Sequence, residues 1–205
     1  MSKLFIAFKY AVKWLIYPPV IGLSMGHNSW VASPRKIRGR AHITIGRDTF
    51  IAAYSWIESF RSYLGFRYSP QITIGNKVSI GRYCCITATN HIEIEAGCLL
   101  SEYVYISDHS HGINPSKGLP AIQPLTSKGG VRIGAGSFLG YRVTVLPGVN
   151  LGKHCVVGSH SVVTHSFPDY SMIAGAPAVL IKTYCPNEDR WIPVNKNKYY
   201  DKRAH

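Results

Sequence analysis

An acid and two histidines lie together in the stretch YISDHSHGIN, residues 105–114. Imidazole titrates near neutral pH, so a neutral His109 or His111 can take a proton from an attacking hydroxyl and return it to a leaving group. A carboxylate or carbonyl on the other ring nitrogen fixes the tautomer of such a base. Strand neighbours point to opposite faces, so Asp108 is expected to be a poor partner for His109, whereas His109 and His111 share a face if the strand continues. Metal binding and an ordinary surface loop are the alternative interpretations of the two histidines.

The sequence around this stretch has a period of six. Aliphatic residues recur without a slip at Ile133, Leu139, Val145, Leu151, Val157 and Val163, and a glycine follows four of them; Ile74, Ile80 and Ile86 repeat the pattern, and Ile45, Ile51 and Ile57 do so less cleanly. A period of six fits neither an α-helix nor a single amphipathic strand, but it fits a coil of three short strands that each bury one aliphatic residue. An ordinary β-sandwich is disfavoured because its apolar period is two.

Three such hexads form one turn of a triangular prism, and successive turns stack as parallel strands about 4.8 Å apart. The sequence therefore predicts an all-β parallel solenoid. Glycines are expected at its corners, where the backbone needs conformations that a Cβ atom obstructs. One domain over residues 36–182 accounts for most of the 205-residue chain, with an N-terminal helical arm over residues 1–35 and a tail over residues 183–205.

The count of six fails in two long segments, residues 58–71 and residues 107–130. In the first, Arg61, Tyr63 and Arg67 are candidates for saccharide contact, with a solvated loop as the alternative. A regular prism offers no pocket, and an excursion as long as the second is uncommon in a compact domain unless it covers a site. We therefore expect the chemistry at the second interruption, which contains both histidines.

Residues 1–19 form an apolar segment that is broken by Lys9 and Lys13 and ended by Pro18 and Pro19. A membrane-spanning helix is not expected, because the segment lacks an uninterrupted apolar run of about 18 residues. The small-residue cleavage site of a secretory signal is also missing. Two interpretations remain, a helix packed on the domain or its oligomer and an amphipathic helix that lies on an anionic membrane.

The net charge of +13, from 23 Lys and Arg against 10 Asp and Glu, favours anionic partners. Nucleic acid is not expected among them, because the chain has no recognition-helix pattern, ribonucleoprotein motif or zinc-finger spacing. The five cysteines form an odd set without a C-x-x-C pair, which favours a reducing cytoplasm over a disulfide framework or a thiolate metal site. Cys84 is a candidate for an exposed thiol, although no neighbour in sequence activates it.

The repeats of the form Ile-Gly-x-x-x-x, followed by MIAGAPAVLIK at residues 172–182, resemble the hexapeptide-repeat acyltransferases. Within that superfamily, TNHIEI, VYISDHSHG and APAVLIKTYCPNEDRW resemble the O-acetyltransferases that modify sugars of bacterial surface polysaccharides. The resemblance covers about residues 36–192. It implies a left-handed coil, against the general preference for right-handed crossovers, and a homotrimer in which the long loop folds over the cleft between subunits. It also implies acetyl-CoA as the donor and His109 as the catalytic base, with His111 as an accessory.

The same resemblance implies positions for the donor. Phe138 stands where relatives often have a tryptophan against the pantetheine arm, and the implied groove residues are Phe138, Gly140, Tyr141, Ser159 and Thr164. The phosphates need cations, for which Lys182 matches a basic position of the family. Val179 and His165 depart from positions that are commonly basic, so Arg142 and Lys153 are the alternatives for phosphate contact.

Asn90 precedes the catalytic loop by one turn, where its amide either binds a sugar hydroxyl or satisfies its own turn. N-acetylation of an amino sugar is the alternative reaction, because a histidine base serves amines as well as alcohols. A zinc-dependent carbonic anhydrase of the same fold is a further alternative, since His160 and His165 are suitably spaced, but it needs a third ligand. A non-catalytic scaffold is disfavoured by the agreement of the loop, histidine and groove positions. The sequence thus predicts a cytoplasmic acetyl-CoA-dependent sugar O-acetyltransferase that needs no metal.

Overall fold

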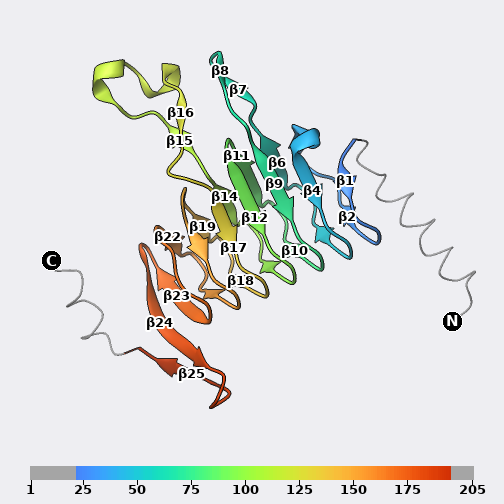
Figure 1. Ribbon diagram of the computed structural model, residues 1–205, viewed down its shortest axis with the longest axis vertical. Coiled ribbons are helices and arrows are strands. Elements are labelled where there is room, and N and C mark those ends of the chain that lie inside the picture. The colour runs from blue at the N-terminus through green and yellow to red at the C-terminus, as the bar shows by residue number, and fades with distance from the viewer. Residues whose placement is uncertain (1–21, 195–205) are drawn as a thin grey trace, which may run out of the picture.

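Short parallel strands stacked into a three-sided prism make up most of residues 22–194, the part of the chain that the computed structural model describes (Figure 1). In each turn the chain runs through three sheets, here named A, B and C. Sheet A contains β1 (Ser24–Met25), β4 (Ile43–Ile45), β9 (Gln71–Ile74), β12 (His91–Ile94), β17 (Val131–Ile133) and β20 (Asn150–Leu151). Sheet B contains β2 (Trp30–Val31), β5 (Phe50–Ile51), β10 (Ser79–Ile80), β13 (Leu99–Leu100), β18 (Phe138–Leu139), β21 (Val156–Val157), β23 (Ser171–Gly175), β24 (Ala178–Cys185) and β25 (Arg190–Pro193). Sheet C contains β3 (Lys36–Arg38), β6 (Trp56–Ser59), β11 (Cys85–Ala88), β14 (Tyr105–Ser107), β19 (Thr144–Val145) and β22 (Val162–Val163).

The remaining elements lie outside the three faces. Two antiparallel hairpins are formed by β7 (Ser62–Tyr63) with β8 (Phe66–Arg67) and by β15 (Ser110–His111) with β16 (Leu125–Thr126). The 3₁₀ helices are η1 (Arg40–His42), η2 (Pro115–Lys117) and η3 (Pro120–Ile122). No helix within residues 22–194 combines the length and the apolarity that a membrane crossing requires.

The predicted period of six is confirmed by the register of the strands. In sheet A, Ile94 pairs with Ile133 and Ile133 with Leu151, and all three side chains are buried. The aliphatic residues of successive turns therefore form continuous columns inside the prism, each side chain contributing about 1.5–3 kcal/mol by its removal from water. The all-β parallel solenoid is thus as predicted, and the left hand of the coil stays a prediction from the family resemblance.

The repeat glycines serve a purpose different from the predicted one. A Cβ on Gly134 would lie 2.4 Å from the backbone of Gly152 in the next turn, so close approach of the coils excludes a side chain there. The left-handed corner conformation is adopted two residues after the repeat glycine, in several coils by residues that carry a side chain, among them Lys77 and His154. Glycine is therefore required by the spacing between coils rather than by its own φ.

All long interruptions leave the prism at one corner, where sheet C ends and sheet A begins; we call it the loop corner. The insertion after β6 spans residues 60–70 and carries the β7–β8 hairpin, and the loop after β14 spans residues 108–130. We call them the first insertion and the catalytic loop. Their starts differ slightly from those predicted, because β6 continues to Ser59 and β14 to Ser107. Stacked coils thus bring two segments distant in sequence to one edge (Figure 1).

The prism is longer than the predicted residues 36–182. Residues 24–31 of the expected helical arm form β1 and β2, which pair in parallel with β4 and β5, so the helix prediction is wrong for this part. The period of six already begins there, at Met25, Val31 and Ile37. Residues 1–21, and with them the predicted amphipathic segment 1–19, lie outside the described residues. At the other end, β24 crosses the predicted boundary at residue 183 and pairs with β25.

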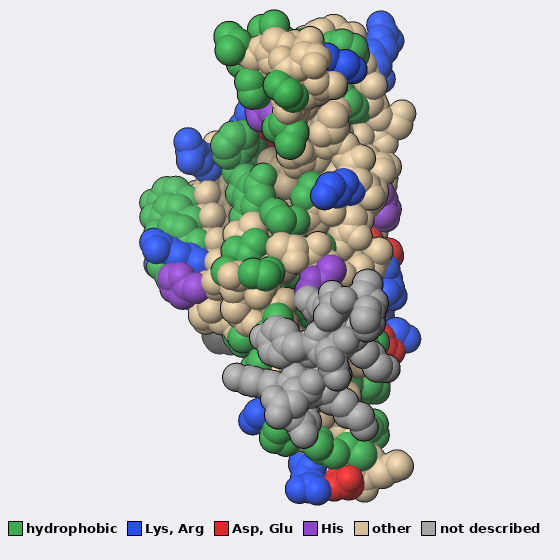
Figure 2. Space-filling model, turned by 90° about the vertical axis from the view of Figure 1, so that its left-hand side faces the viewer, with side chains coloured by type: hydrophobic (Ala, Val, Ile, Leu, Met, Phe, Trp, Pro, Cys, Tyr) green, Lys and Arg blue, Asp and Glu red, His purple; other side chains and the backbone are tan. Residues whose placement is uncertain are grey.

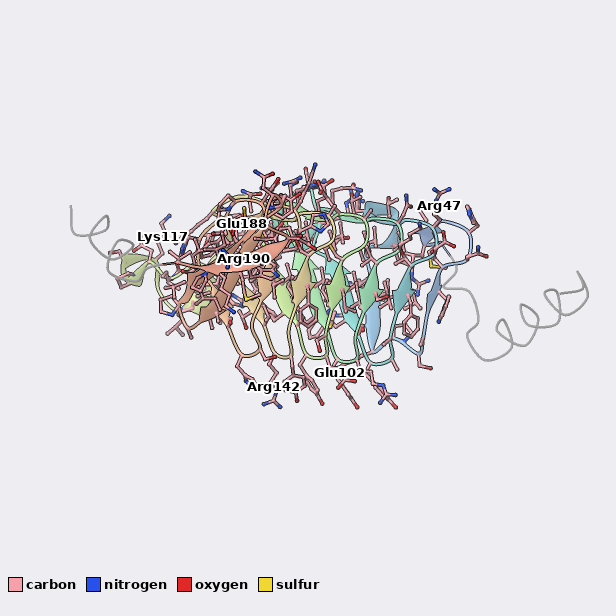
Figure 3. The ribbon with its side chains drawn as sticks, turned by 90° about the horizontal axis from the view of Figure 1, so that it is seen from below. Arg47, Glu102, Lys117, Arg142, Glu188 and Arg190 are labelled. Carbon is pink, nitrogen blue, oxygen red and sulfur yellow. The ribbon has the colours of Figure 1, made fainter. Side chains whose placement is uncertain are left out.

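The surface is basic and its corners carry long side chains. Lys and Arg side chains are spread over the face shown in Figure 2, on which acidic side chains are sparse. Glu102 and Arg142 project from one edge of the prism, Arg47 from another, and Lys117 lies on the protruding catalytic loop (Figure 3). Cys84 is buried at 1% exposure, so the prediction of an exposed thiol there is wrong.

Candidate active site

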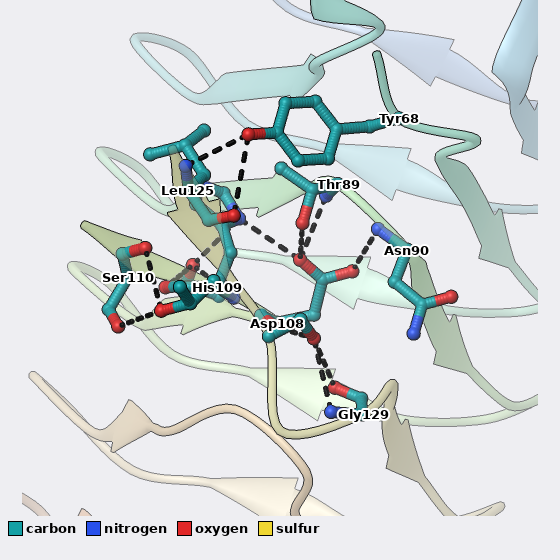
Figure 4. A network of polar contacts seen from close by, with 11 residues as sticks. Tyr68, Thr89, Asn90, Asp108, His109, Ser110, Leu125 and Gly129 are labelled. Atoms are coloured by element: carbon teal, nitrogen blue, oxygen red, sulfur yellow. Dashed lines mark hydrogen bonds and ion pairs between the residues drawn. The ribbon is translucent and has the colours of Figure 1, made fainter. Parts of the chain in front are cut away.

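Asp108 is the first residue after β14 and is fully buried at the loop corner. Its Oδ1 accepts the backbone N–H of Thr89 at 2.8 Å and its hydroxyl at 3.3 Å, and its Oδ2 accepts the backbone N–H of Asn90 at 2.8 Å. These donors come from the same corner of the preceding turn (Figure 4). A buried carboxylate is stable only when it is hydrogen-bonded, and here the backbone of the neighbouring coil satisfies it.

The same carboxylate orients His109. Asp108 Oδ1 lies 3.0 Å from His109 Nδ1, and Ser107 Oγ lies 3.3 Å from the same nitrogen. The prediction that Asp108 is a poor partner for His109 is therefore wrong. It assumed that side chains alternate along a strand, but β14 ends at Ser107 and the backbone turns at Asp108. With a carboxylate as partner, Nδ1 carries the proton and Nε2 is left with its lone pair.

The His109 ring is held in place on its other side as well. Its centroid is 5.4 Å from that of Phe60, an edge-to-face contact with the first insertion, and only 10% of the side chain is exposed. Within residues 22–194, no hydrogen bond reaches Nε2. A fixed, partly shielded imidazole with a free basic nitrogen is the arrangement that general-base catalysis requires.

His111 is exposed and lies in a different environment. It belongs to β15, which pairs with β16 in a separate hairpin, and its ring contacts Tyr63 of the first insertion at 5.5 Å between centroids. The strand that would have placed both histidines on one face ends before His109, so their shared face does not form. The accessory role of His111 stays a prediction.

Asn90 lies at the loop corner, one turn before His109, as predicted. Its backbone holds Asp108, while its side chain is exposed beside the carboxylate (Figure 4). The backbone contact was not anticipated, because no spacing in the sequence indicates which N–H groups meet a carboxylate from the next coil. The exposed amide remains a candidate to bind an acceptor hydroxyl.

The first insertion supports the catalytic loop. The Tyr68 hydroxyl accepts the N–H of Leu125 at 2.8 Å and donates to its carbonyl at 3.3 Å, and the Tyr63 hydroxyl donates to the carbonyl of Ala121 at 3.2 Å. Ser127 Oγ donates to the carbonyl of Asp108 at 2.5 Å, which ties the end of the loop to its start. Sequence reasoning missed Tyr68 and Ser127, since a tyrosine in an aromatic loop and a serine near glycines give no specific signal.

A buried glutamine fixes the catalytic loop internally. Gln123 is 3% exposed, its amide nitrogen donates to the carbonyls of Asn114 and Gly118, and its Oε1 accepts the N–H of Asn114. Three hydrogen bonds between this one side chain and backbone groups hold the loop in a defined shape without regular secondary structure. The catalytic loop is thus built as part of the site.

The residues assigned to the donor do not meet His109 within one chain. Gly140, Tyr141 and Ser159 lie at the corner between sheets B and C, next to Phe138 on sheet B, and Lys182 lies on β24 of the same sheet. Sheet C separates that corner from the loop corner. Only Thr164 lies on the side of His109, because Ile106, Val145 and Val163 pair in succession and place Thr164 two coils beyond Ser107.

The ligand pair required for a zinc hydratase is not formed. His160 contacts Tyr141 at the corner between sheets B and C, whereas His165 follows β22 at the loop corner and packs against Phe167. Within residues 22–194, no group of three or more His, Cys, Asp or Glu residues is placed to hold a metal ion. His160 and His165 therefore do not share a site within one chain, and His154 and His160 are six residues apart, a spacing that the repeat alone produces.

Comparisons with known proteins indicate a transferase built from hexapeptide repeats. The family model of the bacterial transferase hexapeptide (six repeats) matches residues 130–165. Over 142 residues the chain is 36% identical to a probable acetyltransferase of Mycobacterium tuberculosis, a match that covers 69% of this chain and only 44% of that longer protein. Over 144 residues it is 34% identical to the putative lipopolysaccharide biosynthesis O-acetyl transferase WbbJ of Escherichia coli K12, with 65% of this chain and 74% of WbbJ covered.

Among solved structures, the chain is similar to AntD, an N-acyltransferase from Bacillus cereus in complex with dTDP and 3-hydroxybutyryl-CoA. The TM-score is 0.62 with 18% sequence identity, and the match covers 95% of this chain and 92% of AntD. At that identity the likeness concerns the fold alone. Because the sequence match to WbbJ extends over most of that protein and the repeats build the expected prism, this chain belongs to the hexapeptide-repeat acetyltransferases.

Proposed function

We propose that this protein transfers an acetyl group from acetyl-CoA to a hydroxyl of a sugar that belongs to a surface polysaccharide or its precursor. The observation that carries the proposal is the pair of Asp108 and His109, a buried carboxylate 3.0 Å from Nδ1 of an imidazole whose Nε2 is free. The sequence match to WbbJ, a putative lipopolysaccharide O-acetyl transferase, supports a sugar hydroxyl as the acceptor.

The chemistry needs one base and no covalent enzyme intermediate. His109 Nε2 removes the proton of the sugar hydroxyl as its oxygen attacks the thioester carbonyl, and Asp108 stabilises the imidazolium that forms. Collapse of the tetrahedral intermediate breaks the carbon–sulfur bond, and His109 returns the proton to the thiolate of CoA. Cys84 has no part in this scheme, since burial raises the pKa of its thiol to about 12 and so disfavours the nucleophilic thiolate.

The donor site is completed by a second subunit in this proposal. His109 and the groove formed by Phe138, Gly140, Tyr141 and Ser159 lie at different corners of one prism, so a neighbouring copy has to bring its groove to the loop corner. A homotrimer provides such an arrangement three times, because each subunit then contributes its base to one cleft and its groove to the next. Lys182 and Thr164 are assigned to the two ends of the same acetyl-CoA site.

A hydroxyl acceptor and an amine acceptor differ in the product. WbbJ is named an O-acetyl transferase and AntD an N-acyltransferase. The sequence match to WbbJ favours a hydroxyl as the acceptor, because the likeness to AntD concerns the fold.

The five free cysteines within the described residues favour a reducing compartment, and we place the reaction in the cytoplasm, where acetyl-CoA is made. Contact of residues 1–19 with the inner face of the membrane is part of the proposal. Deletion of these residues should abolish co-sedimentation with anionic vesicles.

Calorimetric titration with acetyl-CoA is the first test. We expect saturable binding near one site per chain, with acetate as the negative comparison and CoA as the positive one. A screen of sugar acceptors by mass spectrometry should then give a product that alkaline hydroxylamine cleaves, as it does an ester and not an amide, and that His109→Ala no longer forms. Absence of binding at millimolar acetyl-CoA would contradict the proposal.

A further inference from the structure

Ser107 is the last residue of β14 and carries a buried hydroxyl directly before Asp108 and His109. Its side chain is 1% exposed, and it is in register with Thr87 of the preceding coil. Towards the following coil, the pairing of β14 with β19 stops one residue earlier, at Ile106. The backbone that follows Ser107 therefore leaves the sheet, and its polar groups need partners other than a strand.

The hydroxyl of Ser107 binds both polar groups of the His109 backbone. Ser107 Oγ donates to the His109 carbonyl at 2.8 Å and accepts the His109 N–H at 3.2 Å. A serine hydroxyl that accepts the N–H two residues ahead closes a tight local turn, which here replaces the ladder of the sheet. The alternation of the strand ends at this turn, and the turn brings the His109 ring to the Asp108 carboxylate.

The same hydroxyl oxygen lies 3.3 Å from Nδ1 of the His109 ring. A hydroxyl has one proton and two lone pairs, and the proton of Ser107 is donated to the His109 carbonyl. Towards Nδ1, Ser107 Oγ is therefore an acceptor, as is the Asp108 carboxylate at 3.0 Å (Figure 4). The donor and both acceptor positions of one buried hydroxyl thus serve a single residue, the base.

From this geometry we infer that Ser107 is a positioning residue for His109. Its hydroxyl fixes the backbone and the ring of His109 together, so that Nδ1 stays on the Asp108 carboxylate and Nε2 keeps its lone pair. Asp108 alone holds one edge of the ring, whereas the backbone that carries the ring has left the sheet. Fixing both lowers the cost of reaching the reactive geometry. This role rests on the proposed function, because it concerns the base of the same reaction.

The Ser107→Ala variant tests this role by steady-state kinetics. We expect kcat to fall roughly tenfold, through loss of the hydrogen bonds that hold the base, while KM for acetyl-CoA stays as in the wild type. Ser107→Thr should restore most of kcat, since a threonine, Thr87, already occupies the paired position of the preceding coil. Ser107→Val has nearly the shape of threonine without the hydroxyl, and it should be as slow as Ser107→Ala.

A double variant separates positioning from a general structural role. In the His109→Ala background, Ser107→Ala should leave the residual rate unchanged, because the group on which Ser107 acts is gone. The matched control is Ser29→Ala, at the corner between sheets A and B. The Ser29 hydroxyl also donates to a carbonyl, that of Gly46 at 2.6 Å, and accepts a backbone N–H, that of Thr49 at 2.9 Å. This control should keep the kcat of the wild type.

Nitrogen NMR spectra of the His109 ring provide a measurement that needs no substrate. Above the pH range in which imidazole titrates, the wild type and Ser107→Thr should carry the ring proton on Nδ1. In Ser107→Ala the ring is free to leave Asp108, so a larger share should carry the proton on Nε2.

A Ser107→Ala enzyme with either the kcat or the ring spectrum of the wild type would overturn the inference. An equal loss of rate in the presence and absence of His109 would do the same. If the wild type transferred no acetyl group, the proposed function would be contradicted, and the ring spectra would still decide the role of Ser107.

Discussion

Asp108 Oδ1 lies 3.0 Å from His109 Nδ1 while the carboxylate also accepts the backbone N–H groups of Thr89 and Asn90. One side chain thus joins two turns of the prism and the base. The imidazole is therefore held in position by the backbone of the solenoid, although the loop that follows it has almost no regular structure. Fixing a base in this way lowers the cost of reaching the reactive geometry.

Replacement of Asp108 by asparagine should lower kcat by roughly 10²- to 10⁴-fold, because the imidazolium loses its counter-charge and the tautomer is no longer fixed. Circular dichroism checks that the prism stays folded. The decisive comparison is the double variant with His109→Ala. If Asp108 acts through His109, the second substitution should add little to the first, whereas independent multiplication of the two effects would contradict the pairing.

The two histidines should differ in their effect on turnover. His109→Ala should lower kcat by roughly 10²- to 10⁴-fold without unfolding the protein, the usual contribution of a general base. His111→Ala should leave kcat within about tenfold, since its ring is exposed and contacts only Tyr63 among aromatic neighbours in residues 22–194. Initial rates at saturating substrate measure both. The opposite order would move the assignment of the base to His111.

Tyr68→Phe should loosen the catalytic loop. The substitution removes both hydrogen bonds to Leu125, each contributing about 1 kcal/mol, and keeps the ring. We expect faster amide exchange over residues 112–126 and a weaker affinity for the acceptor, with little change in global stability. Tyr105→Phe is the control, because Tyr105 is exposed on β14 and makes no side-chain hydrogen bond with the described residues. Equal exchange in both variants would argue against the anchoring role.

Phe138→Ala should raise KM for acetyl-CoA roughly tenfold and leave kcat nearly unchanged, as expected for a side chain that packs against the pantetheine arm. Leu99 occupies the paired position one coil earlier on sheet B and is also exposed. Leu99→Ala should therefore leave KM unaltered. A KM for Phe138→Ala equal to that of wild type would remove this residue from the donor groove.

Two buried thiols should make stability depend on alkaline pH. Burial raises the pKa of Cys84 to about 12 and that of Cys98 to about 11, from 9.0. Both contribute stability that is fully present below pH 9, where folded and unfolded thiols are protonated, and that is lost as the pH rises towards the folded pKa, because only the unfolded thiols ionise. Urea unfolding at pH 8 and pH 10.5 should show this loss. A variant with both Cys84→Ala and Cys98→Ala should show a smaller difference.

The prism could be predicted from the sequence because each of its determinants is local. One aliphatic residue in six places a side chain inside, and the spacing of Ile133, Leu139 and Val145 alone specifies three faces. The same period shows where the coil is interrupted, and thus that His109 starts an excursion. The pattern is present even at Met25 and Val31, where the apolar character of the preceding segment wrongly favours a helix.

The contacts that make a site depended on tertiary structure, because they join residues from different turns. Asp108 can orient His109 because β14 ends at Ser107 and because the preceding coil supplies the N–H groups of Thr89 and Asn90 to the carboxylate. The register of stacked coils, which no local pattern encodes at an irregular corner, also brings the first insertion against the catalytic loop. A sequence specifies which side chains are available in the repeat, whereas the lengths of the corner segments and the way they stack decide which of them meet.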